Sequence, residues 1–423
     1  MKNKILVSFS FFCSLSFNAY ANGIINNTLQ SSSSIFSGVQ PARTFGLEKG
    51  FLNPASLADL KDKIYISVSD VLVKNNHVIE SKKTNKQYSS NQETHVPSLL
   101  IAKKYIGTTF YLTHSAVGGR GVLDFGSDGI PLMDTIPNQI SYLLSQNLGA
   151  DVISLSEKKS FRVKEEIIGT NIGFAKAFTK NTNLALSFRY VSGKQKVKGA
   201  YMVKSFLKSN PTTIIQQDKY EIDSSSNANG TGYTISVNHK KEKYNISVRF
   251  DSRVNLNFKV DSKKNNFLAG EEYPDLKNNS NYRKDLAETL ATGIEYNIDP
   301  TLKLLAGFSL YIQDNKSYDD SAVDNGYDLA LSLFKEYSDN LSIGGSFAYN
   351  KTGGNKKTRT QLASDFDGYA IGFGGVYKIN EKFAVNFSHG RTLYDTSEAK
   401  DLFGEYKIRR NVNVFGIGVE LNI

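Results

Sequence analysis

The chain has 423 residues, with 51 lysines and arginines against 41 aspartates and glutamates, which gives a net charge of +10. Its basic residues are scattered, and the sequence has no lysine- or arginine-rich block and no aromatic–basic motif, so the composition argues against a nucleic-acid-binding protein. Glycine, tyrosine and phenylalanine number 33, 23 and 26. That composition is typical of an all-β chain.

Residues 1–21 have the pattern of a secretory signal peptide. Lys2 and Lys4 precede a mostly apolar run, Ile5–Phe17, and Ala19–Ala21 (AYA) forms a small-residue cleavage site. The only cysteine, Cys13, lies in this segment, so the predicted mature chain has no thiol for a disulfide, a metal ion or a nucleophile. No later apolar run reaches 18 residues, so no transmembrane helix is predicted.

The last residues, Asn411–Ile423, alternate with a period of two, which predicts an extended strand with one apolar and one polar side. The apolar side comprises Phe415, Ile417, Val419, Leu421 and Ile423. A soluble β-sandwich could contain such a strand. A terminal strand that is apolar to its last residue is more typical of an outer-membrane barrel, whose last strand pairs with its first. Gly418, Leu421 and Ile423 also resemble the sorting signal for the barrel assembly machinery, which usually ends in Phe.

Similar alternation recurs along the chain and predicts a closed antiparallel transmembrane β-barrel of about 14 strands. The segments are residues 63–75, 96–105, 108–123, 160–179, 183–202, 230–240, 243–261, 285–298, 301–314, 326–338, 340–350, 366–379, 382–395 and 405–423. In one of them, Leu184–Tyr190, an arginine stands among the small and polar residues. Because an arginine facing lipid near the midplane costs about 2–4 kcal/mol, Arg189 is predicted to face the lumen.

The connections alternate between short and long. The short ones are Lys180–Thr182, Lys241–Glu242, Asp299–Pro300, Ser338–Asp339 and Asn380–Glu381. The long polar ones include Asn75–Thr94, Gly126–Lys159, Val203–Asn229 and Ser262–Lys284. Short periplasmic turns and long extracellular loops are the asymmetry of outer-membrane barrels. It therefore favours the barrel over the sandwich and places both mature termini in the periplasm.

The predicted organisation is a signal peptide (1–21), an N-terminal plug (22–60) and a transmembrane barrel (61–423). Asn22–Leu60 has no period of two and is rich in small and polar residues. Such a segment either hangs in the periplasm or packs as a plug, or hatch, inside the lumen.

One long connection contains a predicted helix. From Pro137 to Gly149 the apolar residues follow helical spacing, with proline suited to the first turn and glycine to the end. The apolar residues are Ile136, Ile140, Leu143, Leu144 and Leu148. The helix either caps the barrel mouth or lines an entry surface for a hydrophobic ligand.

Three stretches together resemble the FadL family of outer-membrane long-chain fatty acid transporters. Gly50–Leu57 (GFLNPASL) is similar to the Asn-Pro-Ala motif that ends the family's plug before the first strand. Ser115–Gly126 (SAVGGRGVLDFG) lies in the third strand, where the family has an inward kink. Asn325–Leu333 (NGYDLALSL) is similar to a later family hairpin. The resemblance extends over nearly the whole mature chain, whereas the loop sequences do not match closely.

The resemblance implies a monomeric transporter that captures a fatty acid or another hydrophobic compound at its extracellular loops. The substrate then leaves sideways into the outer-membrane lipid through the kink. On this interpretation the substrate path includes Gly118, Gly119, Arg120, Gly121, Ile140, Leu143 and Leu144, and the plug motif is Asn53, Pro54 and Ala55. Glycines suit a kink because they mark bulges where ladder pairing stops. Arg120 could bind a carboxylate, or could simply pair with Asp124 or Asp128, and the glycines could form a tight bend without a gate.

The sequence leaves two other functions open. A general diffusion porin would need an open lumen, and would leave the 22–60 segment unexplained. An enzyme would need a dyad that uses a strand histidine, His114 or His389. No Ser–His or Asp–His spacing supports one, and these histidines are expected to be lumen or rim residues. The sequence predicts no catalytic residues, no cofactor and no metal site, since His, Asp and Glu do not cluster at ligand spacing.

Overall fold

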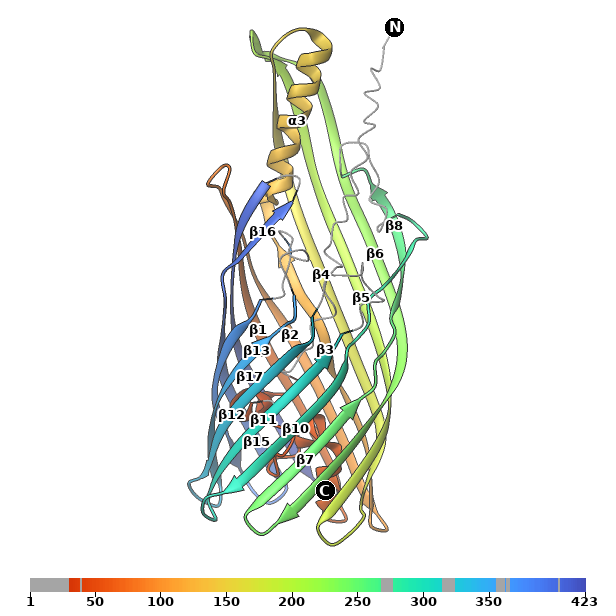
Figure 1. The fold of residues 1–423 in the computed structure, drawn as a ribbon, viewed down its shortest axis with the longest axis vertical. Helices are drawn as coiled ribbons and strands as arrows, with labels where there is room; N and C mark the ends of the chain where they lie inside the picture. The colour runs from red at the N-terminus through yellow and green to blue at the C-terminus, as the bar shows by residue number, and fades with distance from the viewer. Residues whose placement is uncertain are drawn as a thin grey trace.

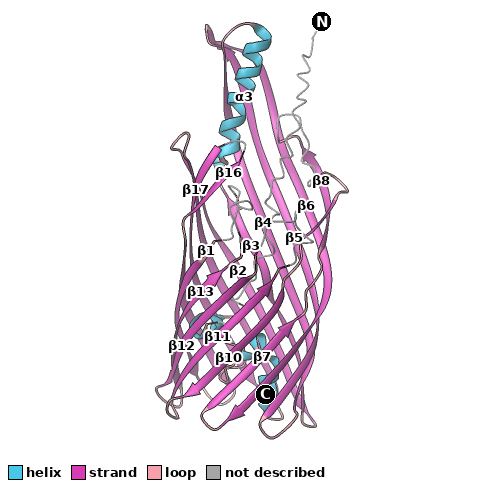
Figure 2. Ribbon diagram, viewed as in Figure 1, coloured by secondary structure: helices cyan, strands magenta, loops and turns pink. Residues whose placement is uncertain are grey.

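The computed structural model describes residues 30–38, 40–267, 277–313, 324–354, 362, 366–401 and 404–423. They form one closed, twisted β-sheet, a tall barrel with tilted strands (Figure 1). Fourteen antiparallel strands make the wall, as predicted. The helices lie inside the lower part of the barrel and at its upper end (Figure 2). The predicted signal peptide lies outside the described residues.

The wall strands follow one another around the barrel in chain order. They are β1 (Ile64–Ser81), β2 (Gln87–Tyr105), β3 (Thr108–Asp124), β4 (Val152–Ala177), β5 (Thr182–Leu207), β6 (Asn210–Lys241), β7 (Tyr244–Asp251), β10 (Glu288–Asn297), β11 (Leu302–Ile312), β12 (Gly326–Glu336), β13 (Leu341–Lys351), β14 (Gly368–Lys378), β15 (Phe383–Tyr394) and β17 (Gly404–Asn422).

Shorter elements complete the described structure. Three short strands extend the wall at its upper end: β8 (Asn257–Asn265) pairs with β6, β9 (Asn281–Arg283) with β8, and β16 (Ser397–Asp401) with β17. The helices are α1 (Ser32–Ser37), α2 (Lys49–Leu52) and α3 (Pro131–Leu148), with 3-10 turns η1 (Pro54–Asp59) and η2 (Gly126–Asp128). No helix in this part of the chain is long and apolar enough to cross a membrane.

The barrel closes through its last strand. One edge of β17 pairs with β15, and the other pairs with β1 from Tyr65↔Asn422 to Ser81↔Tyr406. At the end of this ladder Ile64 and Ile423 exchange two backbone hydrogen bonds of 2.8 Å. The closure of Asn411–Ile423 against the strand beginning near Ile64 is therefore confirmed, and it leaves neither strand with an unpaired edge.

The wall has an apolar outer face and a mainly polar inner face. On β5 the outward side chains Leu184, Leu186, Phe188 and Tyr190 are exposed, whereas the inward ones, Asn183, Ala185, Ser187 and Arg189, are buried. Exposed large apolar side chains recur on other strands, for example Leu331 of β12, Phe373 of β14 and Ile417 of β17. In water so many exposed apolar side chains would be unfavourable, but facing lipid they are stable. Arg189 faces inward, as predicted.

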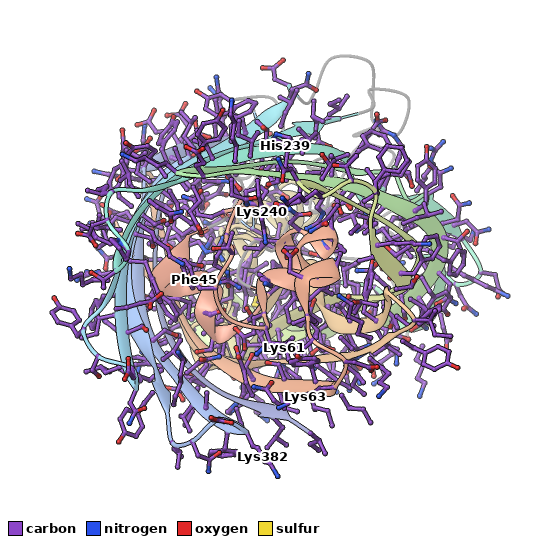
Figure 3. All side chains as sticks on the ribbon, turned by 90° about the horizontal axis from the view of Figure 1, so that it is seen from below. Phe45, Lys61, Lys63, His239, Lys240 and Lys382 are labelled. Atoms are coloured by element: carbon purple, nitrogen blue, oxygen red, sulfur yellow. The ribbon has the colours of Figure 1, made fainter. Side chains whose placement is uncertain are left out.

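The N-terminal segment, residues 30–60, lies within the ring of strands near the end with the short turns (Figure 3). Strand carboxylates hold its backbone: Thr44 N donates to Glu295 of β10 at 2.9 Å, and Leu47 N donates to Glu420 of β17 at 3.0 Å. A buried irregular segment needs such partners, because its backbone groups have no ladder to pair with.

The hairpins are longer than the sequence suggested, which corrects several of the predicted loops. The segments predicted as loops 75–94, 126–159 and 203–229 are partly or largely strand, because β1, β2, β4, β5 and β6 continue into them. Alternation persists there: Val203, Tyr220 and Ile222 are all buried on the inner face. Most outward residues of these extensions are polar, since they lie beyond the lipid, and their polarity resembles that of a loop.

Two predicted element bounds were also wrong. The helix begins at Pro131 rather than Pro137, although it ends as predicted at Gly149, whose φ of 63° is left-handed. Pro137 lies inside the helix, where it cannot donate to the preceding turn, and its side chain is buried. The predicted strand 243–261 is divided into β7 and β8, because Ser252–Leu256 leaves the ladder.

A charge in the middle of the apolar face should destabilise the barrel. We expect Ile417→Lys to lower the free energy of unfolding in lipid bilayers by about 2–4 kcal/mol, because Ile417 is 62% exposed on the lipid side. Asn411→Lys, higher on the same face of β17, is the matched control and should have little effect. Equal urea-unfolding midpoints for both variants and the wild type would contradict the assignment of this face to lipid.

Candidate functional site

The ladder between β3 and β4 is regular except at one bulge. Pairing is one to one up to Ala116↔Ile168 and again from Gly121↔Glu165, but between these points β3 has two more residues than β4. A bulge bends its strand and leaves backbone groups outside the ladder. This bulge contains four residues that the sequence had singled out, Gly118, Gly119, Arg120 and Gly121.

Two of these glycines are required by the backbone. Gly119 has φ +101° and Gly121 has φ +72°, values that side-chain-bearing residues rarely adopt. A Cβ atom on Gly119 would also lie 2.7 Å from the carbonyl oxygen of Glu165. A larger residue at position 119 would therefore force the bulge to change shape.

The wall beside the bulge lacks backbone pairing on its other side. The β2–β3 ladder runs from Tyr105↔Thr108 only to Leu99↔His114. Beyond that point, in the described structure, β2 pairs with β1 and β3 pairs with β4. A hydrogen bond joins the two strands again higher up, where the backbone nitrogen of Asp124 donates to Ser90 Oγ at 2.8 Å. We call residues 90–98 of β2 and 115–124 of β3 the unpaired stretch, because no ladder joins these two segments to each other in the described structure.

Inside the bulge, Arg120 is part of a buried ion cluster. Its Nε donates to Glu165 at 3.0 Å and its Nη1 donates to the carbonyl oxygen of Leu362 at 2.9 Å. Lys284 donates to the other oxygen of Glu165. All three charged side chains are at most 4% exposed. Arg120 thus forms its ion pair with neither Asp124 nor Asp128, the partners considered from the sequence.

An apolar cluster lies beside these charges inside the barrel. Val117, next to the bulge, packs with residues from four other parts of the wall, namely Ile167, Val191, Val254, Leu256, Phe258 and Leu286. Val254 and Leu256 reach it because Ser252–Leu256 turns away from the ladder between β7 and β8. The inner side of the bulge therefore borders an apolar region, although the lumen is mostly polar.

A cavity of about 50 Å³ lies between the bulge and the N-terminal segment. Gln30, Pro41 and Leu52 line it from that segment, Val117 from β3, and Arg189, Arg249 and Asp251 from β5 and β7. A volume of this size holds a few water molecules. A lipophilic molecule would therefore need the surrounding side chains to move.

The two arginines that line the cavity differ in how fully they are hydrogen-bonded. Arg249 Nε donates to Asp251 at 3.0 Å, and its Nη1 donates to the carbonyl of Phe51 at 2.6 Å, which ties the wall to the N-terminal segment. Arg189 Nη1 lies 3.8 Å from Asp251, and its Nε and Nη1 form no hydrogen bond within the described structure. Leaving a buried guanidinium donor unsatisfied is costly. This cavity can accept a water molecule or an anionic group at Arg189.

The sequence analysis singled out Arg189 and Arg120 but missed their charged partners. Glu165 in the middle of β4 and Asp251 at the end of β7 are inward-facing acids within predicted strands, so the same period-two argument that placed Arg189 in the lumen would have found both. Lys284 and Arg249 were also missed. Lys284 precedes β10 in an irregular segment, where no periodicity indicates which way it faces.

The plug motif begins the turn η1. Asn53 Oδ1 accepts a hydrogen bond from Ala55 N at 3.2 Å, and its Nδ2 donates to Asn238 of β6 at 3.1 Å. Pro54 occupies the first turn, where its missing N–H costs nothing. Ala55 N also donates to Ser236 of β6 at 3.0 Å. The motif therefore fixes both the turn and its contact with the wall.

Helix α3 covers an apolar cluster at the upper end of the barrel. Ile140 and Leu144 are buried in this cluster, while Leu143 is partly exposed. Asp134, in the first turn, accepts hydrogen bonds from Lys86, Tyr88 and Lys159. Burial would raise the pKa of Asp134, but these hydrogen bonds outweigh burial and lower it to about 2. A stably ionised carboxylate thus holds the helix to β2 and β4.

The strand histidines considered for catalysis face outward. His114 is exposed and pairs with Thr170 at 2.9 Å, and His389 packs between the exposed Phe373 and Phe415. The expectation of lumen or rim positions was wrong, because each side chain falls on the apolar face of its strand. In the described part of the chain no group of three or more His, Cys, Asp or Glu side chains could hold a metal ion.

A closed barrel of fourteen strands with an apolar outer face is the architecture of a bacterial outer-membrane protein. No protein-family model matches the sequence, and no curated protein matches it. Solved structures resemble it in fold. A Pseudomonas aeruginosa FadL homologue superposes with a TM-score of 0.64 at 12% identity, covering 95% of this chain and 99% of that one.

Two structures of toluene transporters are also similar. The Pseudomonas putida transporter TodX has a TM-score of 0.63 at 10% identity, over 93% of this chain and 98% of that one. The Ralstonia pickettii transporter TbuX has a TM-score of 0.59 at 10% identity, over 94% and 98%. The fold is therefore that of FadL-type barrels, as the sequence motifs had suggested.

Proposed function

We propose that this chain takes up hydrophobic compounds across the outer membrane as a monomeric transporter and is not an enzyme. The observation that carries the proposal is the bulge at Gly118–Gly121. On one side the bulge borders the unpaired stretch of the wall, and on the inner side it borders an apolar cluster and a cavity. The fold it shares with a FadL homologue and two toluene transporters supports the same function.

The proposed path has three steps. A hydrophobic molecule is captured at the extracellular end, where Ile140 and Leu144 of α3 must part from the cluster that they cover. It passes down to the cavity beside Val117. It then leaves sideways into the bilayer between β2 and β3. Sideways exit is favourable for such a molecule, because it avoids both the polar lumen and the residue 30–60 segment beneath.

The substrate class we propose is a long-chain fatty acid or another lipophilic compound. Arg189 supports a substrate with a carboxylate, since its buried Nε and Nη1 lack hydrogen-bond partners in the described structure and a carboxylate would supply them. Arg120 is less suited to bind a carboxylate, because its guanidinium already donates to Glu165.

Closing the bulge should abolish lateral exit. Deleting Gly118 and Gly119 shortens β3 by two residues, so that Ala116, Val117, Arg120 and Gly121 would pair in regular register with Ile168–Glu165, with Arg120 opposite Glu166 on the outer face. We expect the barrel to assemble and uptake of a radiolabelled long-chain fatty acid into cells to fall at least several-fold. Deleting Lys83 and Thr84 from the exposed β1–β2 turn is the control. Unchanged uptake by the bulge deletion, at normal membrane levels, would refute the lateral path.

The electrical conductance of the protein distinguishes the proposed transporter from a general diffusion porin. The intact protein should show no steady large conductance in planar bilayers, because the residue 30–60 segment occupies the ring. Deleting residues 30–50 should produce a conducting pore, since it removes the contacts to Glu295 and Glu420. A large steady conductance of the intact protein would favour the porin. No change on deletion would mean that the segment does not block the lumen.

A further inference from the structure

The outer face of β4 and β5 carries a dense group of cations. We call it the basic patch, and it consists of Arg162 and Lys164 on β4 and Lys194, Lys196 and Lys198 on β5. The register puts Arg162 opposite Lys198 and Lys164 opposite Lys196. Directly opposed like charges destabilise a sheet, because their Cβ atoms lie only about 5 Å apart. An anion that bridges β4 and β5 would therefore stabilise these opposed cations.

These side chains point away from the barrel interior. Their neighbours in sequence, Val163, Glu165, Gln195 and Val197, are buried on the inner face. The basic side chains are accessible: Arg162 is 56% exposed, Lys164 43% and Lys198 51%. The patch thus lies on the surface that surrounds the barrel. Its β4 residues pair with Val122 and Asp124 of β3, so the patch borders the strand beside the proposed exit.

The height of the patch follows from the strands themselves. On the outer face of β5, exposed apolar side chains end with Phe188 and Tyr190, and Lys194 follows four residues later. At about 3.3 Å per residue and a tilt near 40°, this separation is ~10 Å along the barrel axis. Tyrosine is typical of the membrane interface. The patch therefore lies at headgroup level, at the end away from the short turns, which is the outer leaflet.

Acidic neighbours balance the patch only in part. Arg162 pairs with Asp124 at 3.4 Å, Lys164 with Glu166 at 2.7 Å and Lys198 with Asp223 at 3.4 Å. Lys194 and Lys196 have no ion pair in the part of the chain that the structure describes. On β1 and β17, by contrast, outward cations at a similar position face acids across the strands, as in Arg409–Glu80 at 3.1 Å.

We propose that the basic patch binds the phosphate groups of a phosphorylated lipid of the outer leaflet. Guanidinium and ammonium donors on two adjacent strands suit several phosphate oxygens at once. Below the patch, Ile168 on β4 and then Tyr190 and Phe188 on β5 form an apolar outer surface, which provides a place for the acyl chains of the same molecule. That continuity favours a lipid headgroup over a free phosphate ion. The proposal does not depend on the transport function.

The test uses the purified full-length protein in detergent micelles, with diphosphorylated lipid A as the probe and its dephosphorylated form for comparison. The wild type should bind the phosphorylated form more tightly. Lys194→Gln with Lys196→Gln should weaken that binding roughly ten- to thirty-fold, because each removes one cation from an anionic lipid surface. Lys194→Arg with Lys196→Arg should retain binding.

Lys176→Gln with Lys180→Gln, near the opposite end of the same wall, is the matched control and should bind like the wild type. Circular dichroism and the gel shift between unheated and heated samples check that each barrel is folded. Equal affinities of the wild type and the Lys194/Lys196 glutamine variant would overturn the proposal. So would equal binding of both lipid forms. Competition by inorganic phosphate at the concentration of the lipid would assign the patch to a free anion instead.

Discussion

The structure depends on one constraint, which is that backbone hydrogen-bonding groups facing lipid must be paired. Inside a bilayer no water can replace a missing partner, so the sheet has to close on itself. The β1–β17 ladder and the reciprocal bonds of Ile64 and Ile423 achieve this closure. Against this background the unpaired stretch between β2 and β3 stands out, because it interrupts the ladder between two neighbouring wall strands.

The same constraint explains the buried charges of the lumen. A closed barrel of this width cannot be filled by wall side chains alone, so the N-terminal segment fills its lower part. Its irregular backbone needs hydrogen-bond acceptors, and Glu295 and Glu420 supply them. Arg249 in turn donates to the carbonyl of Phe51. Higher up, the Arg120–Glu165–Lys284 cluster joins the bulge to Leu362, which belongs to the apolar cluster that α3 covers.

Much of the wall could be predicted from the sequence, because period-two alternation directly reports which face of a strand is buried. It gave the strand count, the closure and the inward position of Arg189. This alternation did not reveal the extensions of β5 and β6 beyond the lipid, because their outward side chains become polar although the strand continues. It failed again at His114 and His389, which are polar residues on the apolar face. The contacts around the bulge depend on pairs distant in sequence, such as Arg120 with Glu165, and no single-strand pattern specifies them.

A reversible disulfide across the unpaired stretch tests most directly whether the substrate leaves between β2 and β3. A Cβ atom on Gly121 would lie 3.9 Å from the Cβ of Thr94, a distance suited to a disulfide, and Cys13 is the only native cysteine. Because Gly121 has a φ of +72°, a cysteine there strains the bulge, so the reduced double variant, which carries the same strain, is the reference for uptake. The measurement is fatty acid uptake by cells carrying Thr94→Cys with Gly121→Cys, under oxidising and reducing conditions. Uptake should be lost when the disulfide forms and return on reduction, whereas each single variant should be insensitive to the oxidant. Equal uptake by the oxidised and reduced double variant would contradict exit between β2 and β3.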